Sequence, residues 1–181
     1  MGHNIDNDGG KGHPQSRGEH TMQTTKLALH TIKNNDSMFD VEITENVLDA
    51  ERISYVVLFN DVLATNAYDE TFYVSFRTAE EADKYVQEYV DNHGMKFVDI
   101  DTDTIIITNH FSINEIKHDV ELHRCQNLWR SGYLSVTYEV KSIFGEMENG
   151  EICSNCHGYD VYQHETLSGA RKDFEFYSTE V

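Results

Sequence analysis

Basic residues and proline are both scarce in this sequence. It has 14 Lys and Arg against 32 Asp and Glu, a formal net charge of −18, and one proline in 181 residues. So large an acidic excess excludes a protein whose main surface grips nucleic-acid phosphates through Lys and Arg. It also disfavours docking on anionic lipid. We therefore expect a basic protein partner, with no direct contact to nucleic acid or membrane.

Long apolar runs and known catalytic motifs are also missing. No run of 18 apolar residues predicts a transmembrane helix, and the polar N-terminus lacks the apolar core of a secretory signal. Three cysteines are odd in number, which disfavours a disulfide framework, so we expect a cytoplasmic protein. The signatures of P-loop NTPases, dinucleotide-binding folds, nucleophile-elbow hydrolases and HExxH metalloproteases are absent. The sequence therefore predicts a protein that is not an enzyme.

The apolar residues that are present predict a folded core rich in strands. Aromatic residues make up 11% of the chain, and apolar and polar residues alternate in many short segments. This pattern predicts an α+β fold, a mostly antiparallel β-sheet with two α-helices, of which a ferredoxin-like arrangement is one form. No internal repeat is evident. Strands are expected near 25–32, 38–44, 53–59, 71–77, 95–100, 104–108, 133–144 and 152–162, with a last short strand at 173–177.

Two segments carry helix start signals. A helix is expected over about 78–93, where Thr78 opens a capping box before an apolar stripe. A second helix is expected over about 113–130, because Ser112 opens another capping box and apolar residues follow at helical spacing.

The N-terminus differs in composition from the rest. Residues 1–24 contain five of the 11 glycines and the only proline, with almost nothing apolar to bury. We therefore expect a flexible tail over 1–24 and a single acidic α+β domain over 25–181.

The acidic residues are concentrated in one part of the chain. Residues 36–103 hold 17 Asp and Glu but only four Lys and Arg. Several lie off the apolar stripe of the first expected helix, and others alternate along a strand and so project from one face. Such rows of carboxylates resemble the phosphates of a nucleic acid. The partner-binding surface is therefore predicted at Asp83, Glu88, Asp91, Asp99, Asp101 and Asp103.

A CxxCH string is the most specific chemical motif in the chain. Cys153, Cys156 and His157 match the attachment motif of c-type haem, but covalent attachment requires export, which the sequence does not predict. The CxxC pair also supplies half of a tetrahedral zinc site, which Cys125 and His164 could complete. We favour the alternative of reduced thiols in or near the core, with no cofactor.

These features favour a small, acidic, non-enzymatic interaction protein. It would inhibit a basic nucleic-acid-binding partner by nucleic-acid mimicry or steric block, as phage anti-defence inhibitors and immunity proteins of nuclease toxins do as a class. One alternative is a structural or assembly protein, such as a virion component, with an N-terminal arm and a homo-oligomeric state. The other is a zinc-containing module built on the CxxC pair.

Overall fold

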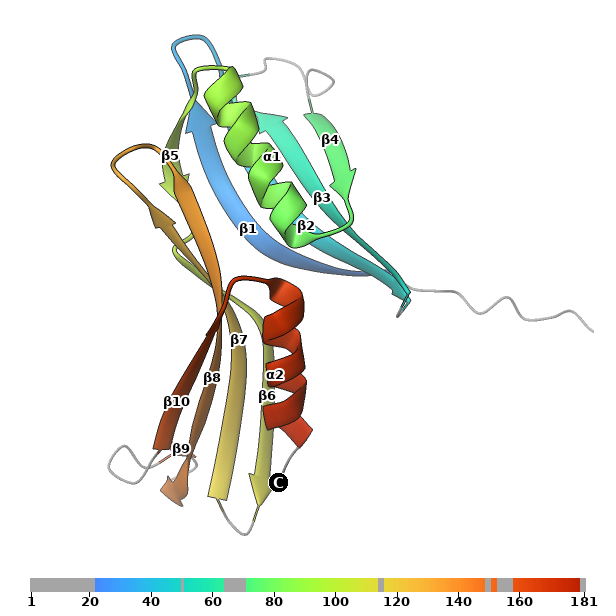
Figure 1. Cartoon of the computed structure of the whole chain (residues 1–181), viewed down its shortest axis with the longest axis vertical. Helices are drawn as coiled ribbons and strands as arrows, with labels where there is room; N and C mark the ends of the chain where they lie inside the picture. Colours follow the sequence, from blue (N-terminus) through green and yellow to red (C-terminus); the bar gives the residue numbers. More distant parts are fainter. Residues whose placement is uncertain are drawn as a thin grey trace, which may run out of the picture.

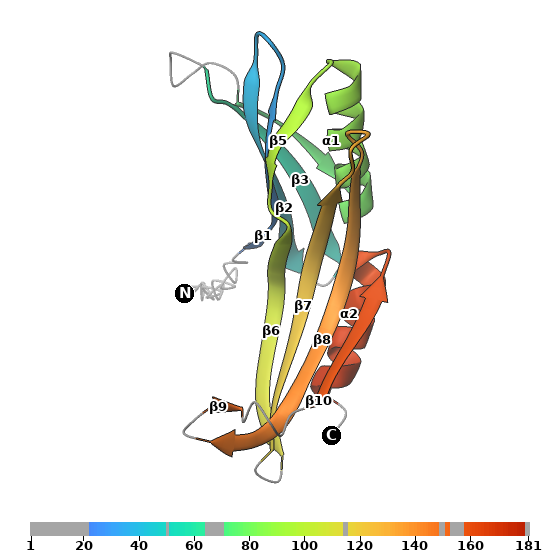
Figure 2. The ribbon, with the colours of Figure 1, turned by 90° about the vertical axis from the view of Figure 1, so that its left-hand side faces the viewer.

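The structure is a computed structural model that describes residues 22–49, 51–63, 71–113, 116–148, 151–152 and 158–179. These residues form two antiparallel β-sheets placed end to end, each with one helix on the same side of the molecule (Figures 1 and 2). The α+β class, with mostly antiparallel sheet and two helices, is confirmed. Residues 1–21 of the expected tail lie outside the described residues.

The N-terminal unit runs from β1 to β5. Its sheet has the order β4-β3-β2-β1-β5, and α1 covers one face. The predicted capping box is present at the start of α1, where Glu81 N–H donates to Thr78 Oγ1 at 3.2 Å. The helix then buries Ala82, Val86 and Val90 against the sheet. The elements are β1 (Gln23–Lys33), β2 (Met38–Asp49), β3 (Arg52–Asp61), β4 (Thr71–Phe76), α1 (Ala79–Asn92) and β5 (Lys96–Ile100).

The C-terminal unit repeats this plan. Its sheet has the order β10-β8-β7-β6, with β9 paired to the end of β8, and α2 covers one face. The elements are β6 (Asp103–Ile113), β7 (Ile116–Leu128), β8 (Leu134–Glu148), β9 (Glu151–Ile152), β10 (Gly158–His164) and α2 (Leu167–Thr179).

The prediction of a second helix over 113–130 is wrong. This segment is β7, which pairs along its whole length with β8. Val120 and Leu122 are buried with strand periodicity, but the alternation continues through Arg124 and Gln126, which are buried polar residues. Because two polar side chains occupy core positions, the period-two pattern is hidden in the sequence.

The second helix is instead α2, near the C-terminus. A short strand over 173–177 was expected there, which is also wrong. Leu167, Ala170 and Phe174 are buried at helical spacing, and Gly169 N–H donates to Thr166 Oγ1 at 3.2 Å as in an N-cap. The phenylalanines that alternate over this short stretch match a strand equally well, which explains the error.

The strand register shows that the two units are repeats of each other. Each first strand has a bulge at the same place, between Lys26 and Ala28 in β1 and between Ile105 and Ile107 in β6. Each is followed by three more antiparallel strands of the main sheet and a helix. The sequence therefore contains a repeat that was not evident from composition or spacing, because the connections between strands differ in length.

Counting outward from the bulges gives the equivalent positions. Glu45 in β2 corresponds to Arg124 in β7, since each is one residue beyond the partner of the bulge. Tyr55 pairs with Glu45, and Tyr138 pairs with Arg124. Continuing across the sheets makes Thr78 equivalent to Thr166. Residues that are identical in both units include Asp40/Asp119, Val41/Val120, Glu42/Glu121, Tyr55/Tyr138, Thr78/Thr166, Ala82/Ala170, Lys84/Lys172 and Tyr89/Tyr177.

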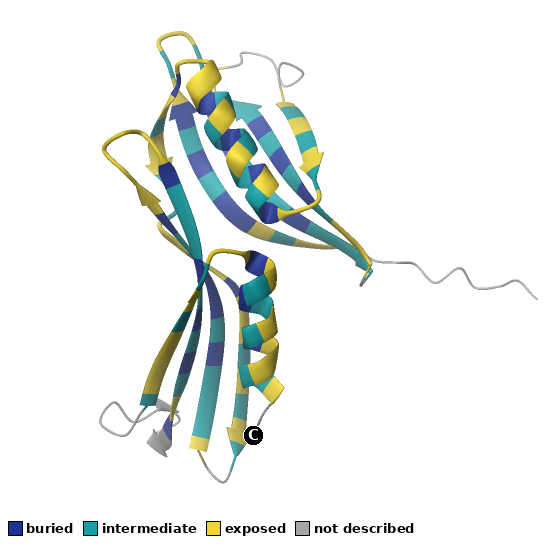
Figure 3. Ribbon diagram, viewed as in Figure 1, coloured by how far each residue is buried: buried dark blue, intermediate teal, exposed yellow. Residues whose placement is uncertain are grey.

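The two units contact each other reciprocally, as the subunits of a two-fold dimer do. Asp83 on α1 forms an ion pair with Arg124 on β7. The equivalent helix residue, Arg171 on α2, forms an ion pair with Glu45 on β2 at 2.6 Å. Both strand residues are almost fully buried, and the apolar core is continuous between the units (Figure 3). The chain is therefore built as a covalently linked pseudo-dimer.

Candidate functional site

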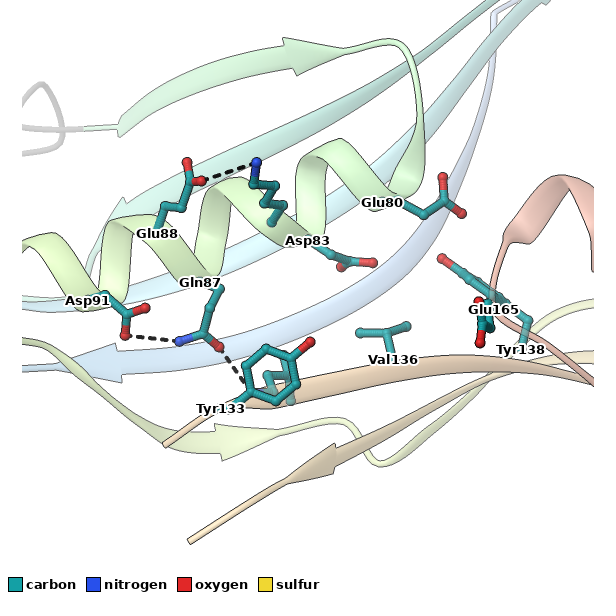
Figure 4. Close-up of a pocket in the computed structure, with 11 residues that line it drawn as sticks. Glu80, Asp83, Gln87, Glu88, Asp91, Tyr133, Val136, Tyr138 and Glu165 are labelled. Carbon is teal, nitrogen blue, oxygen red and sulfur yellow. Dashed lines mark hydrogen bonds and ion pairs between the residues drawn. The ribbon is translucent and has the colours of Figure 1, made fainter. Parts of the chain in front are cut away.

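A groove of about 490 Å³ lies where α1 meets the start of β8, at the boundary between the units (Figure 4). We call it the acidic groove. It is lined by Glu80, Asp83, Lys84, Gln87, Glu88, Asp91, Tyr133, Leu134, Val136, Tyr138 and Glu165.

The groove combines an acidic wall with an apolar one. Glu80, Asp83, Glu88 and Asp91 lie along α1, while the opposite wall presents Leu134, Val136 and two tyrosines from β8 and the turn before it. The single lysine in the lining, Lys84, is 3.5 Å from Glu88 and largely exposed, so it screens one carboxylate weakly. Such a groove favours a ligand with cationic groups on an apolar body, as Arg and Lys side chains have.

Gln87 fixes the geometry of the groove. Its Oε1 accepts the Leu134 N–H at 3.0 Å, and its Nε2 donates to Asp91 Oδ1 at 3.1 Å. One side chain therefore ties the helix to the start of β8 and orients a groove carboxylate, as Figure 4 shows.

Asp83 belongs to the base of the groove and has a structural role there. It pairs with the fully buried guanidinium of Arg124. Burial raises the pKa of Asp83, and the positive charge of Arg124 opposes that shift. Because its carboxylate is already engaged, Asp83 is the least available of the predicted interaction residues.

The structure divides the six predicted interaction residues into two groups. Asp83, Glu88 and Asp91 line the acidic groove together. Asp99 is an exposed residue of β5, Asp101 lies between β5 and β6, and Asp103 begins β6. None of these last three lines the groove. These three residues lie at and beside the connection between the two units, from β5 to the start of β6.

Asp103 is already engaged with two neighbours on the C-terminal unit. Its Oδ1 lies 2.7 Å from His123 Nδ1 and its Oδ2 lies 3.4 Å from Lys141 Nζ. Burial acts to raise the pKa of Asp103, but His123 and Lys141 outweigh it and lower that pKa below its ordinary value. This carboxylate is therefore charged but partly neutralised within the fold.

Two of the four predicted zinc ligands, Cys125 and His164, lie in the part of the chain that the structure describes, and they are not close together. Cys153 and Cys156 lie outside the described residues, as does His157. In the strand register, Cys125 lies opposite Thr137 of β8 and His164 lies opposite Tyr138 of the same strand. Because Thr137 and Tyr138 are consecutive, their side chains point to opposite faces of the sheet, and so do those of Cys125 and His164. Within the part of the chain that the structure describes, no three His, Cys, Asp or Glu side chains are placed to hold a metal ion.

The two described candidates have other surroundings instead. Burial raises the pKa of the Cys125 thiol to about 11, and Glu139 and Asp103 act in the same direction. The thiol therefore stays protonated near neutral pH and is a poor nucleophile. His164 Nε2 lies 3.0 Å from Asp173 Oδ2 on α2.

The groove residues outside Asp83, Glu88 and Asp91 were not predicted from the sequence. Glu80 was detectable, because it lies on the same helix stripe as Asp83, Gln87 and Asp91. Residues of β8 and Glu165 were not detectable, because only the tertiary fold brings them beside α1.

The repeat provides an internal comparison for the acidic groove. The positions equivalent to Glu80, Glu88 and Asp91 on α2 are Ser168, Phe176 and Thr179, and the position equivalent to Glu165 is Arg77. The same scaffold is therefore built elsewhere in the chain without these four carboxylates. Glu80 accepts the Leu167 N–H at 2.9 Å and so has a structural role, but Glu88, Asp91 and Glu165 are exposed and the fold is built at the equivalent positions without a carboxylate.

No protein-family model matches the chain, and no curated protein matches it significantly. In the described residues, no helix has the length and apolar character needed to cross a membrane.

Proposed function

We propose that this chain is a non-enzymatic interaction protein whose acidic groove receives a basic segment of a partner protein. The observation that carries this proposal is the contrast between equivalent positions: the exposed carboxylates of Glu88, Asp91 and Glu165 line the groove, whereas Phe176, Thr179 and Arg77 stand at the equivalent positions of the repeat. Surface positions that the fold leaves free are where binding residues are found.

The partner that fits this groove is a nucleic-acid-binding protein. Its phosphate-binding site would carry the clustered Arg and Lys that carboxylates along α1 attract. Asp99 and Asp101 lie outside the groove, near the start of the C-terminal unit, and add to the negative charge of the molecule. Occupying the basic site would block DNA or RNA by steric and electrostatic competition, the mode used by phage anti-defence inhibitors and immunity proteins as a class.

The test begins with capture of partners from a lysate by the immobilised chain at low and at high salt. We expect recovery of a basic nucleic-acid-binding protein that is lost at high salt and displaced by added DNA or RNA. Recovery of partners that are insensitive to both salt and nucleic acid would contradict the proposal.

A further inference from the structure

The outer edge of β6 is open where the equivalent edge in the N-terminal unit is paired. Among the described strands, β6 pairs only with β7 and forms the border of its sheet (Figure 2). In the other unit, β5 lies antiparallel along the free side of β1, with Thr31 opposite Asp99 and Lys33 opposite Lys96. The molecule thus shows directly that this edge of the repeat accepts an added antiparallel strand.

The composition of β6 is unusual for an open edge. From Thr104 to Ile113 it contains no Asp, Glu, Lys, Arg or Pro, in a chain with 25% charged residues. Ile105 is 53% exposed and Ile107 is 37% exposed. Open edges are normally protected by charges, proline or short length, and β6 has 11 residues. Its counterpart β1 carries Lys33 in the stretch that β5 covers and Lys26 outside it, so β1 has charged residues along an edge that is partly covered, whereas β6 has none between Thr104 and Ile113.

We propose that β6 is a dimerisation edge, along which two copies of the chain pair their β6 strands antiparallel. A two-fold axis generates antiparallel pairing of identical strands, the same orientation that β5 takes on β1. A second β6 also supplies the chemistry that fits, because its β-branched residues cover Ile105 and Ile107.

Charge favours the same occupant. Each chain carries a net charge of −18, so most faces of two copies repel each other. Between Thr104 and Ile113 no acidic residue faces a second copy, so contact there brings together the least charged edge of the molecule. The inference is independent of the acidic groove, which lies at α1 and β8.

The experiment is sedimentation velocity of the full chain over a range of protein concentrations and salt. We expect a dimer whose dissociation constant falls or holds as salt rises, because screening weakens the repulsion. Capture of a basic partner in the acidic groove should show the opposite salt dependence, so the two proposals fail separately. A monomer at every concentration and salt would overturn the dimer.

Matched variants locate the interface. Ile105→Lys and Ile107→Lys each place a charge on the β6 edge and should weaken dimerisation at least tenfold. Tyr73→Lys is the control, since Tyr73 is 71% exposed on β4, the far border of the other sheet. Dimers that survive both β6 changes, or that are weakened equally by the Tyr73 change, would overturn the assignment.

Hydrogen exchange of the unmodified chain keeps the proposal testable if a variant fails to fold. Amides of β6 should be protected at high protein concentration and exchange faster on dilution, while those of β10 stay unchanged. Protection of β6 that survives dilution would assign the edge to an occupant within the same chain, such as residues 1–21, and would overturn the dimer.

Discussion

Asp83 and Arg171 occupy equivalent positions on the two helices, and each reaches across to the equivalent strand position of the other unit. The signs of the two pairs are reversed: Arg124 is the strand residue of one pair and Glu45 is the strand residue of the other. An isologous contact built from a single repeat would place the same two residues in both pairs. The two units therefore share the two-fold geometry, while the charges of the equivalent residues are reversed.

This reversal predicts that the Glu45–Arg171 ion pair can be replaced by an Arg–Asp pair like that of Arg124 and Asp83. Glu45→Arg alone places two arginines together at a site where Glu45 is 2% exposed, and should cost about 3–5 kcal/mol of unfolding free energy. Adding Arg171→Asp recreates the arrangement of Arg124 with Asp83, and Tyr55 can accept rather than donate a hydrogen bond. Denaturant unfolding should show that the double variant recovers at least half of the loss. A double variant no more stable than the single one would disprove the equivalence.

His30 predicts a specific loss of stability in acid. Its ring is 1% exposed, and burial, aided by the charge of Arg124, lowers the pKa of His30 to about 3. In the unfolded chain a histidine takes up its proton near pH 6.5. Between these values the unfolded state binds more protons, so this contribution to stability is complete above pH 6.5 and is lost as the pH falls toward 3.

The measurement is the unfolding free energy of the wild type and His30→Leu between pH 7 and pH 4. The wild type should lose about 1–3 kcal/mol more than the variant over this range. The exposed His93→Gln serves as the control and should follow the wild type. Parallel profiles for the wild type and His30→Leu would show that His30 is not held neutral in the folded state.

Glu80 caps a helix in the other unit. Its Oε1 accepts the Leu167 N–H at 2.9 Å, where the N-termini of α1 and α2 meet. A carboxylate there satisfies a free amide and complements the positive ends of both helices. Glu80→Ala should cost about 1 kcal/mol and speed exchange of the Leu167 amide, while Glu80→Gln, which keeps an acceptor, should cost less. Unchanged exchange at Leu167 in Glu80→Ala would refute the cap.

Sequence patterns predicted the elements whose signals are local. The strands of the N-terminal unit and α1 alternate or repeat cleanly, and Thr78 marks the helix start. The segment of β7 was predicted as a helix because the polar residues Arg124 and Gln126 occupy core positions and hide the strand alternation. Their burial is explained only by tertiary partners: Arg124 pairs with Asp83 of the other unit, and Gln126 donates to the carbonyl of Asp101 between β5 and β6. The repeat was missed for a similar reason. Its matching residues are spread over strands whose connections differ in length, so the strand register was needed to align them.

The candidate site was predictable only in part. Acidic residues on one helix can be placed on a common face from spacing alone, which brought Glu88 and Asp91 into the prediction. The prediction could not distinguish a free carboxylate from one already paired, as Asp83 is, because Arg124 lies 41 residues away in sequence.

The most direct test of the central claim compares partner capture by two variants of equal charge. Glu88→Gln, Asp91→Asn and Glu165→Gln together remove three exposed groove carboxylates. Asp36→Asn, Asp160→Asn and Glu175→Gln remove three exposed carboxylates outside the groove, so the net charge changes equally. We predict that the groove variant loses at least tenfold in affinity for the captured basic partner and that the control variant stays within about twofold of the wild type. Equal losses in the two variants would show that overall charge, and not the groove, attracts the partner.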